Sequence, residues 1–205
     1  AALDALERLY TAGQAWSELI EILGRKAKNI DDTDKVVVLK RRIGELYDQR
    51  LNDPLKAIVS HKEILELDPV NLRAMRALEE LYSKTQQNDN YLRILDLQLD
   101  VVNTDDERIS LFERLAAAFE NLFRKLDKAA ESFEKVLSIN ERHEPSLKQL
   151  ERLYRMQRQW PELVDTYRRH IMAVGESPER QGLYALMGEV YEVEIKDLDR
   201  AIESY

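Results

Sequence analysis

The chain has 205 residues, of which 44% are hydrophobic and 34% are charged, and its formal net charge at pH 7 is −8. Six glycines and five prolines are few for a chain of this length, which favours long helices over loops. The acidic balance disfavours nucleic acid and anionic membranes as partners, and the absence of cysteine excludes disulfides and cysteine-ligated zinc.

A five-residue motif returns along the chain at intervals of 72 residues. Residues 6–10 read LERLY, residues 78–82 read LEELY, and residues 150–154 read LERLY. A second series with the same interval reads IGELY at 43–47, LAAAF at 115–119 and MGEVY at 187–191. The aromatic column of one series follows that of the other after 37 and then 35 residues, so the chain divides into six repeats. Such a period is typical of stacked repeat architectures.

Apolar residues recur at helical spacing twice in each repeat. In the second repeat, Leu39, Ile43 and Leu46 form one stripe, and a second stripe follows Asp53-Pro54, a capping residue and a first-turn proline. Each repeat is therefore predicted to be a helical hairpin. We expect one domain over residues 1–205, with repeats at 1–33, 34–71, 72–105, 106–143, 144–177 and 178–205, the last of them incomplete.

The pattern resembles the tetratricopeptide repeat (TPR) family over the whole chain. Gly44, Tyr47, Ala57 and the pair Asp68-Pro69 fall in the family's columns, with one extra residue near Asn52. The resemblance implies an all-α fold, a right-handed α-solenoid of stacked antiparallel helical hairpins that forms a TPR-like superhelix. It also implies a non-catalytic protein–protein interaction scaffold, whose concave groove is lined by the first helix of each hairpin.

The odd-numbered repeats depart from the family pattern where a small residue is usual. Small residues at this column let the two helices of a hairpin approach closely. The even-numbered repeats have Gly44, Ala116 and Gly188 there, whereas the odd-numbered repeats have Glu7, Glu79 and Glu151. We therefore expect the odd-numbered hairpins to splay wider.

Basic side chains dominate the predicted groove in the third and fifth repeats. Because arginine and lysine bind carboxylates, we expect the groove to hold a peptide or helix, and an acidic one is the sharper hypothesis. The candidate peptide-binding residues are Arg41, Arg73, Arg76, Lys148, Arg152 and Arg155. The alternative is that Arg41 with Glu45, and Arg76 with Glu80, are i,i+4 pairs on a solvated face.

No catalytic, cofactor or metal site is expected. His61, His143 and His170 are dispersed without the spacing of a metal motif, and the glycines form no phosphate-binding loop. His61 occupies an aromatic column, which favours a packing role. We therefore expect no enzyme and no cofactor, and a protein or peptide as the partner, with no nucleic acid and no membrane insertion. The acidic balance and the alternating spacing also oppose an RNA-binding pentatricopeptide array.

Both ends of the chain fall inside a repeat, which predicts a segment of a longer protein. We expect it to be soluble and to carry no signal peptide in this segment, with the compartment open and the cytoplasm slightly favoured. An end-to-end homodimer through Ile202 and Tyr205 is a further expectation. The alternative function is a structural spacer or self-assembling segment of a larger multidomain protein.

Overall fold

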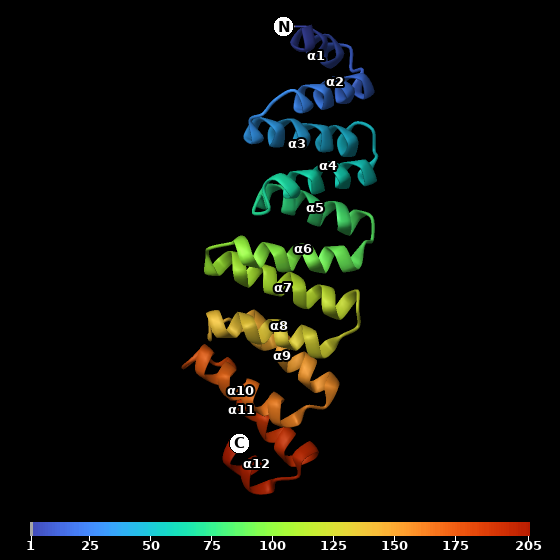
Figure 1. Cartoon of the computed structure of the whole chain (residues 1–205). Helices are drawn as coiled ribbons and strands as arrows, with labels where there is room; N and C mark the ends of the chain where they lie inside the picture. The colour runs from blue at the N-terminus through green and yellow to red at the C-terminus, as the bar shows by residue number, and fades with distance from the viewer. Residues whose placement is uncertain (1) are drawn as a thin grey trace. The chain divides into compact units, whose positions relative to one another are not determined.

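The computed structural model describes residues 2–205, and every regular element in that range is helical. The helices pair in chain order into antiparallel hairpins, from α1 with α2 to α11 with α12 (Figure 1). The elements are α1 (Ala2–Ala12), α2 (Trp16–Lys28), α3 (Thr33–Gln49), α4 (Pro54–Leu67), α5 (Leu72–Lys84), α6 (Asn88–Val101), α7 (Asp105–Asn121), α8 (Leu126–Ile139), α9 (Glu144–Gln157), α10 (Trp160–Val174), α11 (Glu179–Glu189), the π-helical turn η1 (Val190–Ile195) and α12 (Leu198–Ser204). The predicted all-α fold of helical hairpins is confirmed. No helix among the described residues is long and apolar enough to cross a bilayer.

The chain divides into two compact units, Ala1–Val102 and Asn103–Tyr205. We call them the N-terminal unit, which contains α1 to α6, and the C-terminal unit, which contains α7 to α12. Within each unit, every helix packs against the next one along the chain. That all six repeats form one domain stays a prediction.

Each unit has its own apolar clusters. In the N-terminal unit, Leu19 and Leu23 pack with Leu46, and a second cluster gathers around Met75 and Leu78. In the C-terminal unit, one cluster is formed by α7, α8 and α9, and includes Ala116, Ala129, Leu147 and Leu150. The other cluster extends from α10 to α12, and includes Leu163, Tyr167, Met187 and Ala201. These buried faces are the stripes that the apolar periodicity predicts.

The small-residue column permits close helix approach in the even-numbered hairpins. A Cβ added at Gly44 would lie 2.7 Å from His61 Nε2, and one added at Gly188 would lie 2.8 Å from Tyr205 Cε1. Ala116 at the same column is fully buried. The contacts within α3–α4 and α7–α8 are more extensive than those within α1–α2, α5–α6 or α9–α10. Because α3 and α7 are also the longest helices, and α11–α12 makes fewer contacts than any of these hairpins, wider odd-numbered hairpins stay an expectation.

Side-chain caps begin several helices. Asp53 accepts a hydrogen bond from the backbone N–H of Lys56 at 3.1 Å, and Asp197, 144 positions later, accepts one from Arg200 at 3.1 Å. Asp32 and Thr104 cap α3 and α7 in the same way. Each cap satisfies an N–H group that has no partner within its own helix.

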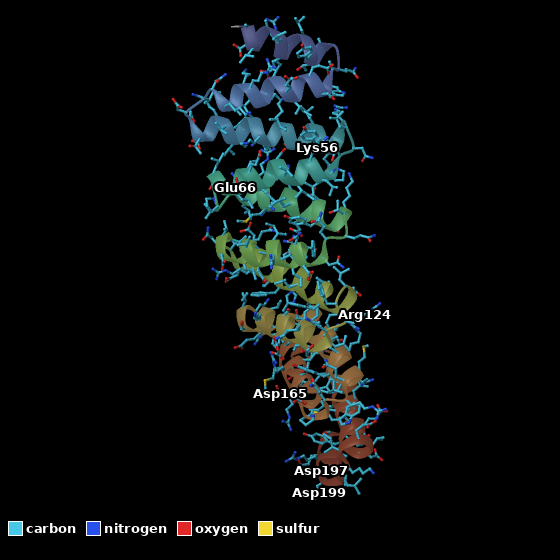
Figure 2. The ribbon with its side chains drawn as sticks, turned by 45° about the vertical axis from the view of Figure 1, so that its right-hand side comes forward. Lys56, Glu66, Arg124, Asp165, Asp197 and Asp199 are labelled. Carbon is cyan, nitrogen blue, oxygen red and sulfur yellow. The ribbon has the colours of Figure 1, made fainter. Side chains whose placement is uncertain are left out.

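The turn inside each hairpin contains one residue in the left-handed conformation. These residues have φ between 50° and 62°, and they are Gln14, Asn52, Gln86, Arg124, Arg158 and Lys196. Figure 2 labels Arg124, at the turn that precedes α8. The residue after each of them donates its backbone N–H to the carbonyl of the aromatic column: Ala15 donates to Tyr10 at 2.9 Å, and Asp53 donates to Tyr47 at 2.8 Å. The even-numbered turns are one residue longer, which accounts for the extra residue near Asn52.

Candidate functional site

A groove lies between α3 and α5 in the N-terminal unit, with His61 of α4 contributing to its wall. Its lining includes three small or apolar residues, Gly44 of α3 and Ala77 and Leu81 of α5. We call it the α3–α5 groove. The lining residues are Arg41, Gly44, Glu45, Asp48, Gln49, His61, Arg73, Ala77, Glu80, Leu81 and Lys84.

Two of the predicted binding residues share one carboxylate in this groove. Arg41 Nε lies 3.7 Å and Arg73 Nη2 lies 3.8 Å from Glu45 Oε1. Both distances exceed those of a good charge-assisted hydrogen bond, which lie near 2.7–2.9 Å. The Arg73 side chain is 70% exposed. The two guanidinium groups are therefore only loosely held by the protein's own carboxylate.

The rest of the groove is charge-balanced. Lys84 Nζ lies 2.8 Å from Asp48 Oδ1, so this pair is more tightly closed than the two arginine pairs. Glu80 adds a third carboxylate to the lining. Burial lowers the pKa of His61, although the nearby carboxylates of Glu45 and Asp48 oppose the shift. The imidazole is thereby favoured in its neutral form and serves as a packed wall of the groove.

Three other predicted binding residues lie on α9 in the C-terminal unit, at positions that share one helix face. Arg152 makes a two-pronged ion pair with Glu120 of α7, with N–O distances of 2.7 and 2.6 Å. This pair lowers the pKa of the Glu120 carboxyl. Arg155 Nη2 donates to Tyr167 Oη at 2.6 Å, and Lys148 Nζ lies 3.1 Å from Glu179 Oε1. All three cations are thus engaged by neighbouring helices.

The six predicted residues therefore fall into two groups, one in each unit. Arg41 and Arg73 meet in the α3–α5 groove, and Lys148, Arg152 and Arg155 share α9. Arg76 is exposed on α5 and lies outside the groove lining, where it interacts with another residue. The i,i+4 pair of Arg41 with Glu45 that the alternative predicts is present at 3.7 Å.

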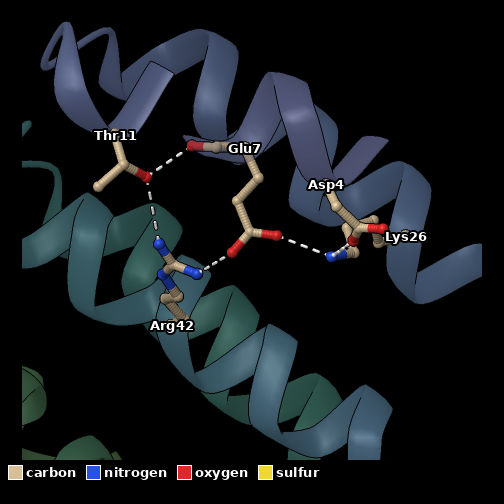
Figure 3. A network of polar contacts seen from close by, with 5 residues as sticks. All are labelled: Asp4, Glu7, Thr11, Lys26 and Arg42. Atoms are coloured by element: carbon tan, nitrogen blue, oxygen red, sulfur yellow. Dashed lines mark hydrogen bonds and ion pairs between the residues drawn. The ribbon is translucent and has the colours of Figure 1, made fainter. Parts of the chain in front are cut away.

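A polar pair inside each odd-numbered hairpin was not predicted. The glutamate at the small-residue column binds a side chain 19 positions later, on the second helix. The pairs are Glu7 with Lys26 at 2.7 Å, Glu79 with Gln98 at 2.8 Å, and Glu151 with His170 at 2.6 Å. Figure 3 shows the first of them. There Glu7 also accepts a hydrogen bond from Arg42 of α3, and Lys26 also donates one to Asp4. The repeated 19-residue separation is the signal that could have identified these pairs in the sequence.

Burial differs along this series of pairs. Glu7 is partly exposed, and its pKa is lowered, first by the hydrogen bond from Lys26. Gln98 and His170 are each only 1% exposed. Burial raises the pKa of Glu151, and the hydrogen bond to His170 opposes that shift. The fifth hairpin therefore holds a buried imidazole whose orientation is set by a carboxylate.

Comparison with known proteins agrees with this architecture. The tetratricopeptide repeat family model matches residues 146–182. A solved tetratricopeptide repeat protein from Parabacteroides merdae is 15% identical, with a TM-score of 0.51 over 99% of this chain and 76% of that one. MamA from AMB-1 is 17% identical, with a TM-score of 0.51 over 83% of this chain and 88% of that one. YrrB, described as a TPR protein with an unusual peptide-binding site, is 15% identical, with a TM-score of 0.48 over 82% of this chain and 86% of that one.

None of the curated proteins matches the chain. The family match lies within the fifth and sixth repeats, and the two structures with a TM-score of 0.51 have the same helical-hairpin fold. The motif columns that return every 72 residues extend the resemblance to the other repeats. Residues 146–182 thus match the tetratricopeptide repeat family, and the rest of the chain shares the family's helical-hairpin fold.

Proposed function

We propose that the chain is a non-catalytic protein-interaction scaffold that binds an extended peptide or a helix along the first helices of its hairpins. The observation that carries this proposal is the α3–α5 groove, where Arg41 and Arg73 share one carboxylate at distances too long for strong hydrogen bonds. A ligand carboxylate can replace Glu45 as their partner without breaking a tight internal ion pair. An acidic residue in the ligand therefore fits this groove.

The second group of proposed binding residues, Lys148, Arg152 and Arg155, requires more from a ligand. Arg152 already binds Glu120 through two short contacts, so a ligand carboxylate must compete with an internal one. We therefore assign the main contacts with the ligand to Arg41 and Arg73. Arg76, which lies on α5 like Arg73, is a neighbouring contact. The net charge of −8 favours a protein ligand over nucleic acid.

The test begins with selection of binding peptides from a random display library against the 205-residue chain. The affinity of the best peptide is then compared between the natural chain and the variant Arg41→Glu/Arg73→Glu. We expect at least a tenfold weaker affinity, because each charge-assisted hydrogen bond contributes about 1.5–3 kcal/mol. Arg25→Glu is the matched control, since Arg25 lies in the same unit on α2 and its side chain is 62% exposed.

Three outcomes count against the proposal. Equal affinity in the double variant places the site elsewhere, and an equal loss in Arg25→Glu reduces the effect to overall charge. Failure to select any peptide favours a structural spacer or self-assembling segment. For self-assembly, the exposed side chains of Ile202 and Tyr205, at 74% and 68%, are where an end-to-end homodimer is proposed. A sedimentation coefficient that stays monomeric at high concentration rejects that dimer.

A further inference from the structure

The imidazole of His170 is buried in the C-terminal unit, with one ring nitrogen left unused. Its Nδ1 lies 2.6 Å from Glu151 Oε1, across the hairpin from α10 to α9. Its Nε2 is buried and has no hydrogen-bond partner among the described residues. A buried polar atom without a partner costs about 1–3 kcal/mol, so such an atom in a native fold calls for an explanation, and a bound ion is one of them.

Two carboxylates converge on the same place. Glu144 and Glu179 are the first residues of α9 and α11, and each has an oxygen that lies within 4.8 Å of the other and of a ring nitrogen of His170. Their side chains are 46% and 44% exposed, so both are free to rotate by the small amount that shorter metal–oxygen distances require. The three groups come from three successive helices of one compact unit.

The contact between His170 Nδ1 and Glu151 Oε1 bears on the remaining nitrogen through the tautomer of the ring. A carboxylate that accepts the Nδ1 proton leaves a lone pair on Nε2, and it also makes the imidazole a stronger ligand. Histidines that bind metals in proteins are commonly held by a carboxylate in this way. Glu151 is therefore a positioning residue for His170 and not itself a ligand.

We propose that His170 Nε2, Glu144 and Glu179 bind a divalent first-row transition metal ion, with water completing its coordination. One imidazole and two carboxylates suit zinc and its neighbours better than calcium or magnesium, which prefer oxygen ligands alone. The ion joins the fifth hairpin to the first helix of the sixth. This inference does not rest on peptide binding, although Lys148 belongs to the proposed peptide-binding residues and also contacts both carboxylates.

One protein cation competes for the same carboxylates. Lys148 Nζ lies 3.1 Å from Glu179 Oε1 and 4.0 Å from Glu144 Oε2. The ammonium group lies at the end of a flexible stem and is 50% exposed as a side chain, so a metal ion can displace it. This competition makes a distinctive prediction: removing the lysine charge tightens metal binding, whereas removing either carboxylate weakens it.

The experiment is calorimetric titration of the chelator-treated 205-residue chain with Zn²⁺, and separately with Ca²⁺. We expect saturable binding of one Zn²⁺, weakened at least tenfold in Glu179→Gln and in Glu144→Gln, and tightened in Lys148→Met. Glu176→Gln is the matched control, because Glu176 is close in sequence and its side chain is 93% exposed. It should bind Zn²⁺ as the natural chain does.

A second measurement avoids substituting the buried His170, because His170→Gln is expected to destabilise the hairpin. It uses the surface variant Glu179→Gln instead. Zn²⁺ should raise the thermal unfolding temperature of the natural chain more than that of Glu179→Gln, whose substitution is on the surface. The proposal is overturned if the natural chain does not bind Zn²⁺, if Glu179→Gln binds it equally well, or if Lys148→Met weakens binding. Equal affinity for Ca²⁺ also overturns it, because the imidazole would then contribute nothing.

Discussion

The imidazole of His61 lies directly against the backbone of Gly44, at the crossing of α3 and α4. A Cβ atom placed on Gly44 would be only 2.7 Å from Nε2 of that ring. The side chain of His61 is 4% exposed and has little room to retreat. The absence of a side chain at residue 44 therefore sets the distance between the two helices.

Replacing Gly44 with alanine should destabilise the N-terminal unit. Overpacking costs about 1–3 kcal/mol, whereas alanine gains up to ~1 kcal/mol in helix propensity, so we expect a net loss of about 1 kcal/mol in the free energy of unfolding. Urea denaturation measures it. Gly24→Ala is the control, because no atom lies within 4 Å of an added Cβ there, and it should stabilise the fold. Stabilisation by both changes would show that the contact with His61 is unimportant.

The stability of the N-terminal unit should fall in mild acid because of His61. Burial lowers its pKa, so in the range below the ordinary histidine value the unfolded chain binds a proton that the folded chain does not. Stability is then complete above that value and decreases as the pH falls through it. His61→Phe should reduce this pH dependence, because it removes the titrating imidazole. The column accepts phenylalanine, which stands there as Phe133 in the fourth hairpin. The measurement is the free energy of unfolding at pH 7.5 and 5.5.

His143→Gln serves as the control for the loss of a histidine. This variant leaves His61 in place, so the free energy of unfolding should still differ between pH 7.5 and pH 5.5. An unchanged pH dependence in His61→Phe would assign the effect to another group.

The ion pair between Arg152 and Glu120 should contribute modestly to stability. The Arg152 side chain is 42% exposed, so water and salt screen the pair, and a double-mutant cycle with Arg152→Ala and Glu120→Gln should give about 0.5–1 kcal/mol at low salt. Because the pKa of Glu120 is lowered, this contribution is present at neutral pH and is lost as acid protonates the carboxyl. A coupling energy that does not decrease in 1 M salt would contradict this account.

The buried pair of Gln98 with Glu79 should be more sensitive to substitution than the partly exposed pair of Lys26 with Glu7. Gln98→Leu removes a 2.8 Å hydrogen bond to Glu79, a residue only 8% exposed, and we expect a loss of about 1–3 kcal/mol. Lys26→Leu is the matched change in the first hairpin. The side chain of Glu7 is 19% exposed, so water can replace its lost partner and the loss of stability should be smaller. Equal losses, measured by urea denaturation, would mean that burial does not govern these pairs.

The hairpins were predictable because their apolar stripes follow the helical period and the motif columns return every 72 residues. The polar pairs were not predicted, because the second partner changes from Lys26 to Gln98 to His170, so only the repeated 19-residue separation from the glutamate marks the column. The groove was predictable only in part. Arg41 and Arg73 could be placed on first helices, but the distances that decide whether Glu45 holds them depend on how α3 and α5 pack.

The cluster around His170 could not be read from sequence spacing at all. Glu144, His170 and Glu179 come from three helices, and their separations in the chain match no local metal motif. Only the packing of α9, α10 and α11 brings them together.

The left-handed backbone conformation recurs in the turn of every hairpin, although the residue at that position differs among the repeats. The same backbone angle persists in every copy, while the residue there has drifted among glutamine, asparagine, arginine and lysine. The six copies therefore share the backbone conformation but not the amino acid. Except at asparagine, which tolerates this conformation, each such residue carries about 1–2 kcal/mol of strain. Glycine adopts this conformation without steric strain, so glycine at those turns should stabilise the fold and offset destabilising mutations elsewhere.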